Sequence, residues 1–525
     1  MNALILSEAT YPRHGGGAGR CAHLVAAGLV RRGHAVHLIS ATGDRLERDR
    51  IDGVEVHRVP TNLDGCAERH LQERVLSERF LSYLRDNVRL PSIDVIHDVG
   101  GFLSYFYDVA RALRAEYAMP VIVHFQFLNL AYRKACDPFP RIGPFSPLAL
   151  GYDAGFPERI QCYAVRIADL IVAPSYSEAS LIRRLFRPLP GRVAVVPNPV
   201  DTSVFPTRPD RHWRHRLGAD RSPVVLFAGR IDDAMKGADL LAEAFSHVLA
   251  ARPDARLVTL ATKASAARLI SRLGQAVECL GWIADAGILA RILSAVHVVV
   301  VPSRYEPFGL VGLEAMAAGV PVVATPVGGL KELVRTGYNG ILLRHKTSSA
   351  WAAELADAVL ALLNQPHLAC TMGRRGRALA HREYRVETVA RRIETLYRLV
   401  ISRPRAPSGR AVLAPPADPE RVRYAALVGS VGGPEAKAAV AGKPLRYHCA
   451  SCTRSVVAET HRELVRLRAV RPGDGQQGEY GRWRRELEAA TRRVCPAGLL
   501  QRAFLGAEGP WDRDSKPLPK RRPRL

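Results

Sequence analysis

The amino-acid sequence predicts an α/β fold of two doubly wound domains that face each other across a cleft, followed by a basic C-terminal extension. Short apolar runs without polar alternation recur along the chain, which is typical of parallel strands covered on both faces. Stretches with apolar residues at helical spacing separate these runs. The pattern stops at a segment rich in Pro and Asp, 197–210, and then starts again.

The first series of strands and helices fills about 200 residues. It opens with the apolar run ALILS at 3–7, and the helical segment 19–33 follows and closes at Gly33. Further expected strands are 35–40, 95–99, 121–125, 170–175 and 193–197. Because helical segments separate these strands, they are expected to form a parallel sheet.

A second series of similar length follows the segment 197–210. Its expected strands are 224–229, 256–262, 277–281, 296–302, 321–325 and 340–344. A last amphipathic segment, 386–400, is expected to be a closing helix. We therefore predict a first domain at 1–200, a second at 201–385, a closing helix at 386–402 that packs back toward the first domain, and an extension at 403–525.

Positive charge is concentrated in the extension. The chain has a formal net charge of +25 and a sequence pI of about 10.2. Residues 403–525 hold 25 Lys and Arg against 12 Asp and Glu, whereas residues 1–402 hold 50 against 38. The Pro- and Arg-rich extension is expected to be largely disordered and suited to peripheral contact with an anionic membrane. No aromatic RNA-binding signature or zinc-finger spacing accompanies the charge, so a nucleic-acid partner is not expected.

Cysteine usage and hydropathy predict a cytoplasmic protein. Nine cysteines are scattered along the chain, which is not typical of a disulfide framework. The segment 1–12 lacks a basic start and is expected to contain a strand rather than a signal peptide. No stretch approaches the roughly 20 apolar residues of a membrane span. Cys449 and Cys452 have zinc-like spacing without a second pair, so metal binding there stays an open alternative.

Two acids flank a turn that leads from an expected strand into an apolar helix. Glu306 precedes the turn, Gly309 opens the helix, and Glu314 lies one to two turns further on. Ligands of open α/β sheets bind outside the carboxyl ends of the strands, and free amides at a helix start suit phosphate. We interpret the acids as holding the two ends of a nucleotide-sugar. The alternative is an ordinary helix acid and a solvated loop acid.

Two cations follow the first strand of the second series. Arg230 comes directly after that strand, and Lys236 follows six positions later, just before Gly237. Fixed cations at the carboxyl end of a strand can neutralise a diphosphate leaving group. The alternative is that both are ordinary surface residues.

The glycine-rich segment RHGGGAGR, 13–20, lies between the first strand and its helix. Its glycines permit close approach of the backbone to a ligand, although a simple flexible turn is the alternative. The segment is not G-x-G-x-x-G, which disfavours a nicotinamide cofactor. An esterase oxyanion hole would need a G-x-S-x-G elbow, which the chain lacks.

His97 and His124 lie near strand ends, where each is either a sugar ligand or a buried structural group.

Together these motifs resemble the family 4 retaining glycosyltransferases of the GT-B fold over residues 1–402. The segments that carry the resemblance are the glycine-rich loop, GHAVHLIS, DVIHDVGG, HFQ, PNPVDTSVF, GRIDDAMKG, EPFGLVGLE and PVGGLKELV. The resemblance implies an enzyme that moves a sugar from a UDP-, GDP- or ADP-sugar to an acceptor hydroxyl in polysaccharide, cell-envelope or glycoconjugate biosynthesis. It implies retention at the anomeric carbon, with no cofactor and no metal. A glucan synthase, a nucleotide-sugar epimerase and a non-catalytic binding protein of the same fold stay alternatives.

The resemblance also implies roles for individual residues, with the acceptor beside the first domain and the donor in the second. Arg230 and Lys236 would bind the donor diphosphate, Glu314 the ribose and Glu306 the donor sugar. The remaining expected site residues are Gly16 and Gly17 near the diphosphate, Phe308, Gly309 and Leu310 as backbone amide donors, and His124 near the sugar. The residues expected to act in catalysis are therefore Glu306, His124, Arg230 and Lys236. Three departures are a longer gap between Arg230 and Lys236, Phe125 after His124, and Pro199 in the linker.

Overall fold

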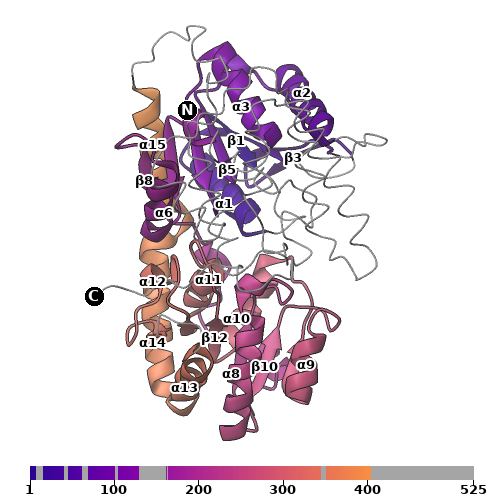
Figure 1. Ribbon diagram of the computed structural model, residues 1–525, viewed down its shortest axis with the longest axis vertical. Coiled ribbons are helices and arrows are strands. Elements are labelled where there is room, and N and C mark those ends of the chain that lie inside the picture. The colour runs from indigo at the N-terminus through magenta and orange to yellow at the C-terminus, as the bar shows by residue number, and fades with distance from the viewer. Residues whose placement is uncertain are drawn as a thin grey trace, which may run out of the picture. The chain divides into compact units, whose positions relative to one another are not determined.

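A computed structural model describes most of the first 403 residues (Figure 1). The described residues are 1–7, 16–40, 45–61, 69–100, 104–128, 161, 164–344 and 350–403. Residues 404–525, including Cys449 and Cys452, lie outside them, so the expectations about the extension stay predictions. Both sheets described below belong to one compact unit of the chain.

The first sheet has eight strands in the order β3-β4-β2-β1-β5-β6-β7-β8. Their bounds are β1 Asn2–Ser7, β2 Ala35–Ser40, β3 Glu47–Ile51, β4 Val54–Arg58, β5 Val95–Gly100, β6 Val121–Phe125, β7 Leu170–Ala173 and β8 Val193–Val195. Every neighbouring pair is parallel except β3 and β4. The hairpin of β3 and β4 was not predicted from the sequence. Asp52 and Gly53 form its turn, and both have positive φ, at 50° and 80°. The Asp-Gly pair was the available signal, because it favours a tight hairpin turn.

Helices cover both faces of this sheet. They are α1 Gly17–Arg31, α2 Arg69–Asn87, α3 Ser104–Tyr117 and α6 Tyr176–Phe186, with a short 3-10 turn η1 at Leu90–Ser92. In β1, Leu4 and Leu6 enter one core, whereas Ala3 and Ile5 enter the core on the opposite face. Successive side chains of a strand point to opposite faces, so an uninterrupted apolar run is the consequence of burial on both sides.

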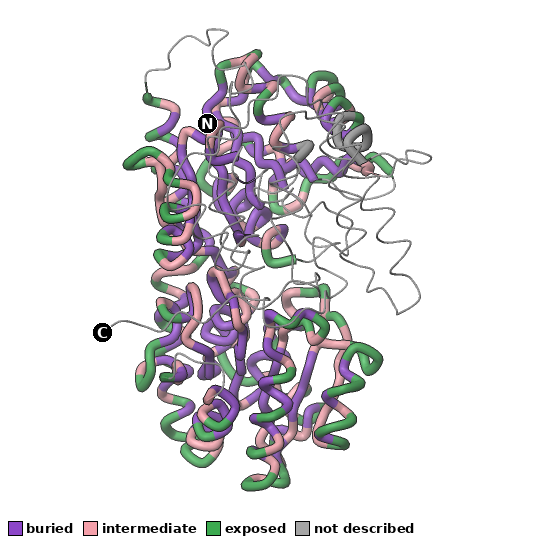
Figure 2. Tube along the Cα trace, viewed as in Figure 1, coloured by how far each residue is buried: buried purple, intermediate pink, exposed green. Residues whose placement is uncertain are grey.

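The second sheet has six strands in the order β11-β10-β9-β12-β13-β14, and all of them are parallel. Their bounds are β9 Val224–Phe227, β10 Arg256–Thr259, β11 Val277–Cys279, β12 Val298–Val301, β13 Val322–Ala324 and β14 Gly340–Leu342. Valines of β12 alternate between two cores, with Val299 and Val301 in one and Val298 and Val300 in the other. Figure 2 shows the buried strands of both sheets beneath more exposed helices.

The second half is also doubly wound. Its helices are α7 Arg211–Arg216, α8 Ala238–Ala251, α9 Ala267–Leu273, α10 Ala286–Ala295, α11 Leu310–Ala318, α12 Leu330–Leu333, α13 Trp351–Asn364, α14 Pro366–Leu379 and α15 Val386–Ile401. Short turns are η2 Thr202–Val204, η3 Ala234–Lys236, η4 Gly274–Ala276 and the π-helical turn η6 Ala380–Tyr384. The two mostly parallel α/β sheets confirm the predicted fold class.

The chain crosses back to the first sheet between η6 and α15. Leu379 and Ala380 are buried in a core of the second sheet, whereas Val389 and Tyr397 of α15 are buried against the first. Helix α15 packs along α1. At the crossover the Val200 amide donates a hydrogen bond of 2.9 Å to the Tyr384 carbonyl. The linker and the returning helix therefore run together at this point.

Candidate active site

The turn between β12 and α11 brings the expected phosphate-binding backbone together. Gly309 caps the start of α11 with φ 108°, and a Cβ there would lie 2.7 Å from the Leu330 side chain. Only glycine adopts this conformation readily and leaves the needed space. The first amides of α11 have no partner within the helix, as at any helix start. Phe308 turns its side chain into the core, 6.0 Å from the Tyr384 ring, so its backbone is what it can offer a ligand.

Glu306 and Lys236 form an ion pair at the carboxyl ends of two adjacent strands. The Lys236 Nζ lies 2.7 Å from the Glu306 Oε2, to which the Ser303 hydroxyl also donates at 3.2 Å. The side chains are partly accessible, with 27% of Lys236 and 14% of Glu306 exposed. The structure thus brings these two residues together, although they are 70 positions apart in the sequence.

Asp233 pairs with Arg230 and caps the turn η3 that carries Lys236. Its buried carboxylate accepts a hydrogen bond of 2.6 Å from Arg230 and another of 3.0 Å from the Met235 amide at the start of η3. Arg230 itself is half exposed. The sequence analysis assigned no role to Asp233, although an acid three positions after Arg230 was a signal of a local ion pair. Anchoring by a buried acid leaves the outer part of the Arg230 guanidinium accessible.

Glu314 is bound by a residue that the sequence analysis missed. Arg20 of α1 donates a hydrogen bond to the Glu314 carboxylate, and the two form an ion pair. Burial raises the pKa of Glu314, and the charge of Arg20 opposes that shift. Arg20 ends the glycine-rich segment and lies in the first turn of α1, and this position was the signal of its role. The pair connects the first sheet's α1 to α11.

Gly17, in the described part of the glycine-rich segment, lies against the start of α11. A Cβ at Gly17 would lie 2.7 Å from the Leu310 Cδ1, whereas one at Gly16 would meet nothing within 4 Å. Gly16 caps α1 in an extended conformation. The structure therefore places Gly17 next to Leu310 at the start of the helix that also carries Glu314, and the roles of Gly16 and Gly17 at a donor diphosphate stay predictions. The first glycine of the run, Gly15, lies outside the described residues.

The structure places His124 in the interior of the first half. It is fully buried in β6 and stacks on His97, with ring centroids 5.6 Å apart and an interplanar angle of 6°. His97 in turn makes a 2.8 Å hydrogen bond with the Tyr397 hydroxyl of α15. Burial lowers the pKa of His124 to about 3, so its imidazole is neutral. Among the described residues, no hydrogen bond or ring contact joins His124 to Glu306 or Lys236.

A second glycine pair supports the Glu306 turn. The Gly329 amide donates a hydrogen bond of 2.9 Å to the Glu306 carbonyl. A Cβ at Gly328 would lie only 1.9 Å from that same carbonyl oxygen. The pair belongs to PVGGLKELV, a segment recognised from its resemblance but given no role. Its two glycines are required because one backbone segment lies directly on another.

Helix α6 of the first half contacts the segment 305–307. The Tyr305 hydroxyl donates at 2.6 Å to the Glu178 Oε1 and accepts at 3.0 Å from the Leu128 amide. The Ser175 hydroxyl donates at 2.7 Å to the Pro307 carbonyl. These bonds flank Glu306 on both sides, so the first half helps to position the carboxylate.

Glu178 gives this contact a pH dependence. Burial raises the pKa of Glu178 from 4.5 to about 7. The hydrogen bond from Tyr305 opposes this rise, and the charge of Glu306 adds to it. The folded state therefore holds a proton that the unfolded chain releases near pH 4.5. We expect the free energy of unfolding to fall by about 3 kcal/mol as the pH rises from 4.5 through 7.

Denaturant unfolding of wild type and Glu178→Gln between pH 4.5 and 8.5 measures this effect. The amide cannot ionise, so the variant is expected to lose this part of the pH dependence and to exceed the wild type in stability near pH 8. Glu332→Gln is the matched control, because Glu332 accepts the Tyr176 and Ser177 amides at 2.8 and 2.7 Å beside the same helix start. Equal pH profiles for wild type and Glu178→Gln would show that the Glu178 carboxyl is already ionised in the folded protein.

One further cluster has metal-binding geometry among the described residues. His37, Glu55 and His57 offer ligand atoms that all lie within 4.8 Å of one another on β2 and β4. The other ring nitrogen of His57 contacts the Tyr83 hydroxyl at 2.8 Å. Burial lowers the pKa of His57 to about 4, which leaves it neutral. This cluster belongs to the first sheet and shares no residue with the Glu306–Lys236 pair.

No helix within the described ranges combines the length and the apolar character that crossing a membrane requires.

Both halves of the chain match glycosyltransferase families. Residues 15–204 match the family described as Glycosyltransferase Family 4, and residues 222–365 match Glycosyl transferases group 1. The two matches together cover more than half of the chain.

Two curated relatives are matched over less than two thirds of their length. An alpha-maltose-1-phosphate synthase from Mycolicibacterium smegmatis is 35% identical over 254 residues, which is 45% of this chain and 65% of the relative. A D-inositol 3-phosphate glycosyltransferase from Segniliparus rotundus is 37% identical over 225 residues, which is 41% of this chain and 49% of the relative. The matched part thus spans between about half and just under two thirds of these relatives.

Solved structures of glycosyltransferases share the fold. A sucrose-phosphate synthase from Thermosynechococcus elongatus has a TM-score of 0.63 at 24% identity, covering 76% of this chain and 99% of the other. Anabaena HepE in complex with UDP-glucose has a TM-score of 0.56 at 22% identity, covering 75% and 99%. These likenesses identify the architecture as GT-B, with two Rossmann-like domains. The chain is therefore a glycosyltransferase, with a Glycosyltransferase Family 4 domain in its first half and a Glycosyl transferases group 1 domain in its second.

Proposed function

We propose that this protein transfers a sugar from a nucleoside-diphosphate donor to an acceptor hydroxyl, with retention at the anomeric carbon. The observation that carries the proposal is the Lys236–Glu306 pair, 2.7 Å apart, next to the Gly309 start of α11. A cation, a carboxylate and the first amides of a helix meet there. A nucleotide-sugar offers complementary groups. Its diphosphate suits the cation and the helix amides, and its sugar hydroxyls suit the carboxylate.

The charges at this site suit departure of a diphosphate. Negative charge grows on the leaving phosphate oxygen as the bond to the sugar breaks, and fixed cations stabilise that charge. Lys236 and the outer face of Arg230 are the cations, and the α11 amides add their partial positive charge. These groups can do what a metal ion does elsewhere, so we propose that turnover needs no metal and survives EDTA.

The carboxylates would take the two ends of the donor. Glu306 can accept hydrogen bonds from sugar hydroxyls once Lys236 turns to the diphosphate. Glu314 can accept from ribose hydroxyls, which would share or replace its present partner Arg20. Arg20 reaches Glu314 from α1, so donor binding would involve both halves of the chain.

The comparisons support the donor class and a biosynthetic role. The HepE structure was solved with UDP-glucose, and the two curated relatives are named for a sugar phosphate and an inositol phosphate. We propose that this chain likewise works in carbohydrate or glycoconjugate biosynthesis. Its own acceptor is to be found by assay.

A thermal-shift screen of UDP-, GDP- and ADP-sugars tests the donor, because a bound ligand raises the apparent stability by mass action. The best donor is then incubated with candidate acceptors, and the product is examined by NMR for retention. Conversion of the donor without any acceptor would instead indicate an epimerase. Failure of every nucleotide-sugar to bind would contradict the proposal and favour a binding protein of another kind.

Glu306 and Glu314 are expected to differ when mutated. Glu314→Ala removes the ribose acceptor and should weaken binding of the product nucleoside diphosphate about tenfold or more. Glu306→Ala should leave that affinity nearly unchanged and lower turnover, because the product nucleotide carries no sugar. Calorimetric titration of the nucleotide into both variants measures the difference. Equal losses of affinity would contradict the division of roles.

A further inference from the structure

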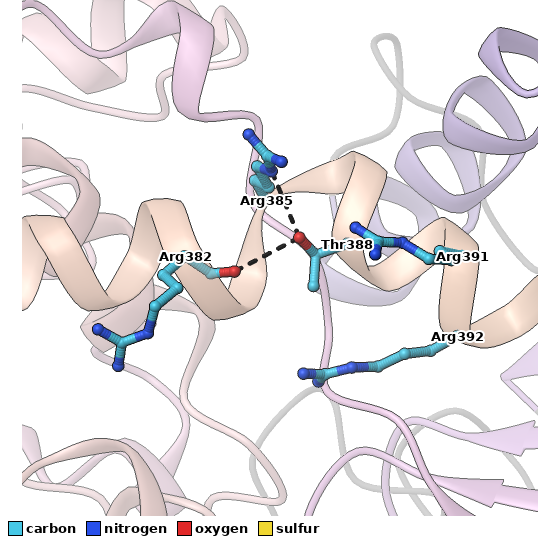
Figure 3. A pocket seen from close by; sticks show the side chains of 5 residues that line it. All are labelled: Arg382, Arg385, Thr388, Arg391 and Arg392. Atoms are coloured by element: carbon cyan, nitrogen blue, oxygen red, sulfur yellow. Dashed lines mark hydrogen bonds between the residues drawn. The ribbon is translucent and has the colours of Figure 1, made fainter.

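A pocket of about 310 Å³ lies where η6 gives way to α15, and four arginines line it. The lining residues are Arg382, Arg385, Thr388, Arg391 and Arg392. Figure 3 shows the four arginine side chains spread around Thr388, from the turn η6 and the first turns of α15. No residue of the Glu306–Lys236 site contributes to it.

Positive charge in this pocket exceeds the acids beside it. Glu383 forms ion pairs with two of the guanidinium groups, at 3.0 Å from Arg382 and 3.0 Å from Arg392. Among the described residues, Arg385 and Arg391 have no carboxylate within ion-pair distance. The nearby Glu387 instead pairs with Arg31 of α1 at 3.3 Å. Four cations and one shared carboxylate leave an uncompensated charge that attracts anions.

Two further features add to the positive potential. Arg385 caps the start of α15, a helix of 16 residues, so the positive end of the helix dipole points at the pocket. The Thr388 hydroxyl lies in the pocket, 3.3 Å from the Arg385 Nε, and donates to the Arg382 carbonyl at 3.4 Å. The neighbouring His381 responds to the same field: burial lowers its pKa first, and the charges of Arg377 and Arg385 lower it further.

We propose that this pocket is a second anion site, which binds the phosphate group of a phosphorylated solute or of a lipid headgroup. Guanidinium groups bind phosphate through two parallel hydrogen bonds, and four arginines from two elements line this pocket. A phosphate bound in this pocket by arginines of both elements would link η6 to α15. Since the chain crosses between its two halves at that point, the ligand would stabilise the crossover. The proposal does not depend on the donor site.

The test compares three variants of the full-length chain by calorimetric titration with inorganic phosphate at constant ionic strength. Arg385→Gln/Arg391→Gln removes two exposed guanidinium groups from the pocket. Arg268→Gln/Arg272→Gln on α9 is the matched control, because it removes the same charge from an exposed helix elsewhere. Lys236→Ala tests independence from the donor site. We expect the pocket variant to bind phosphate about tenfold more weakly or worse, whereas the other two keep one such site.

A parallel arm identifies the source of the phosphate. Sedimentation with phosphatidylglycerol vesicles, and with phosphatidylcholine vesicles as reference, is run for the pocket variant and its control. A loss confined to the pocket variant assigns the site to a lipid headgroup, and unchanged sedimentation assigns it to a soluble phosphate. Equal phosphate affinity in the pocket variant and its control would overturn the proposal. A loss in Lys236→Ala alone would also overturn it, because the anion would then sit in the donor site.

Discussion

Lys236→Ala is expected to lower kcat by ~10²–10³ with a smaller effect on the donor KM, because removal of one fixed transition-state donor has typically that consequence. Lys236 is held by η3, whose start the buried Asp233 caps, and its ammonium lies 2.7 Å from Glu306. The charge it neutralises is larger in the transition state than in the bound donor. Turnover is therefore affected more than binding.

Arg230→Ala is expected to have a similar effect, and the double variant should lose less than the product of the two factors if both act on one phosphate. Lys236→Arg should keep only part of the activity, since the planar guanidinium group of arginine does not have the geometry of the compact ammonium group of lysine. The control is Lys331→Ala, an exposed lysine of the short helix α12. Steady-state kinetics with the donor from the screen measure all of them. Near-native turnover in Lys236→Ala would place the diphosphate elsewhere.

Gly328→Ala is expected to destabilise the protein by roughly 3 kcal/mol or more. The new Cβ would lie 1.9 Å from the Glu306 carbonyl oxygen, and the residue has φ +46°. The left-handed backbone alone costs about 1–2 kcal/mol for an L-residue, and overpacking adds about 1–3 kcal/mol. Because the clash falls on the backbone of Glu306, activity should fall further than the loss of folded protein explains.

Gly337→Ala separates the two contributions. Gly337 has φ +79°, yet a Cβ there would meet nothing within 4 Å, so only the backbone term remains. Chemical denaturation of both variants, followed by activity at a temperature where both are folded, measures the difference. Equal destabilisation would mean that the 306–308 segment shifts easily to admit a methyl group, and the rigid support of Glu306 would be disproved.

Much of the site could be predicted because its parts follow strand ends. Glu306, Gly309 and Lys236 each lie just beyond a strand of one parallel sheet, and carboxyl ends of neighbouring parallel strands share an edge. Strand β12 lies directly beside β9 in the sheet, which places the segment at Lys236 next to the one at Glu306. The sequence pattern was therefore sufficient to group them. Their catalytic roles stay predictions.

For His124 the position near a strand end left the direction of its side chain open. Its position near the end of β6 satisfied the same rule, yet its side chain stacks on His97 in the interior. A strand's side chains alternate between its two faces, and which face a histidine occupies depends on the helices that cover the sheet. Arg20, Glu178 and Asp233 were missed for a related reason, since each acquires its role only from a partner brought close by folding.

Local pattern in the sequence determined the two parallel α/β domains, the linker between them, and the glycines and charges at the strand ends, because hydrophobic periodicity and turn chemistry act over a few residues. Only the tertiary structure decided that Arg20 pairs with Glu314 across 294 positions, and that Tyr305 joins Glu178 across 127. It also decided that the arginines of η6 and α15 surround one pocket. Such contacts depend on how whole elements pack, and burial then sets the charge state of the groups they enclose.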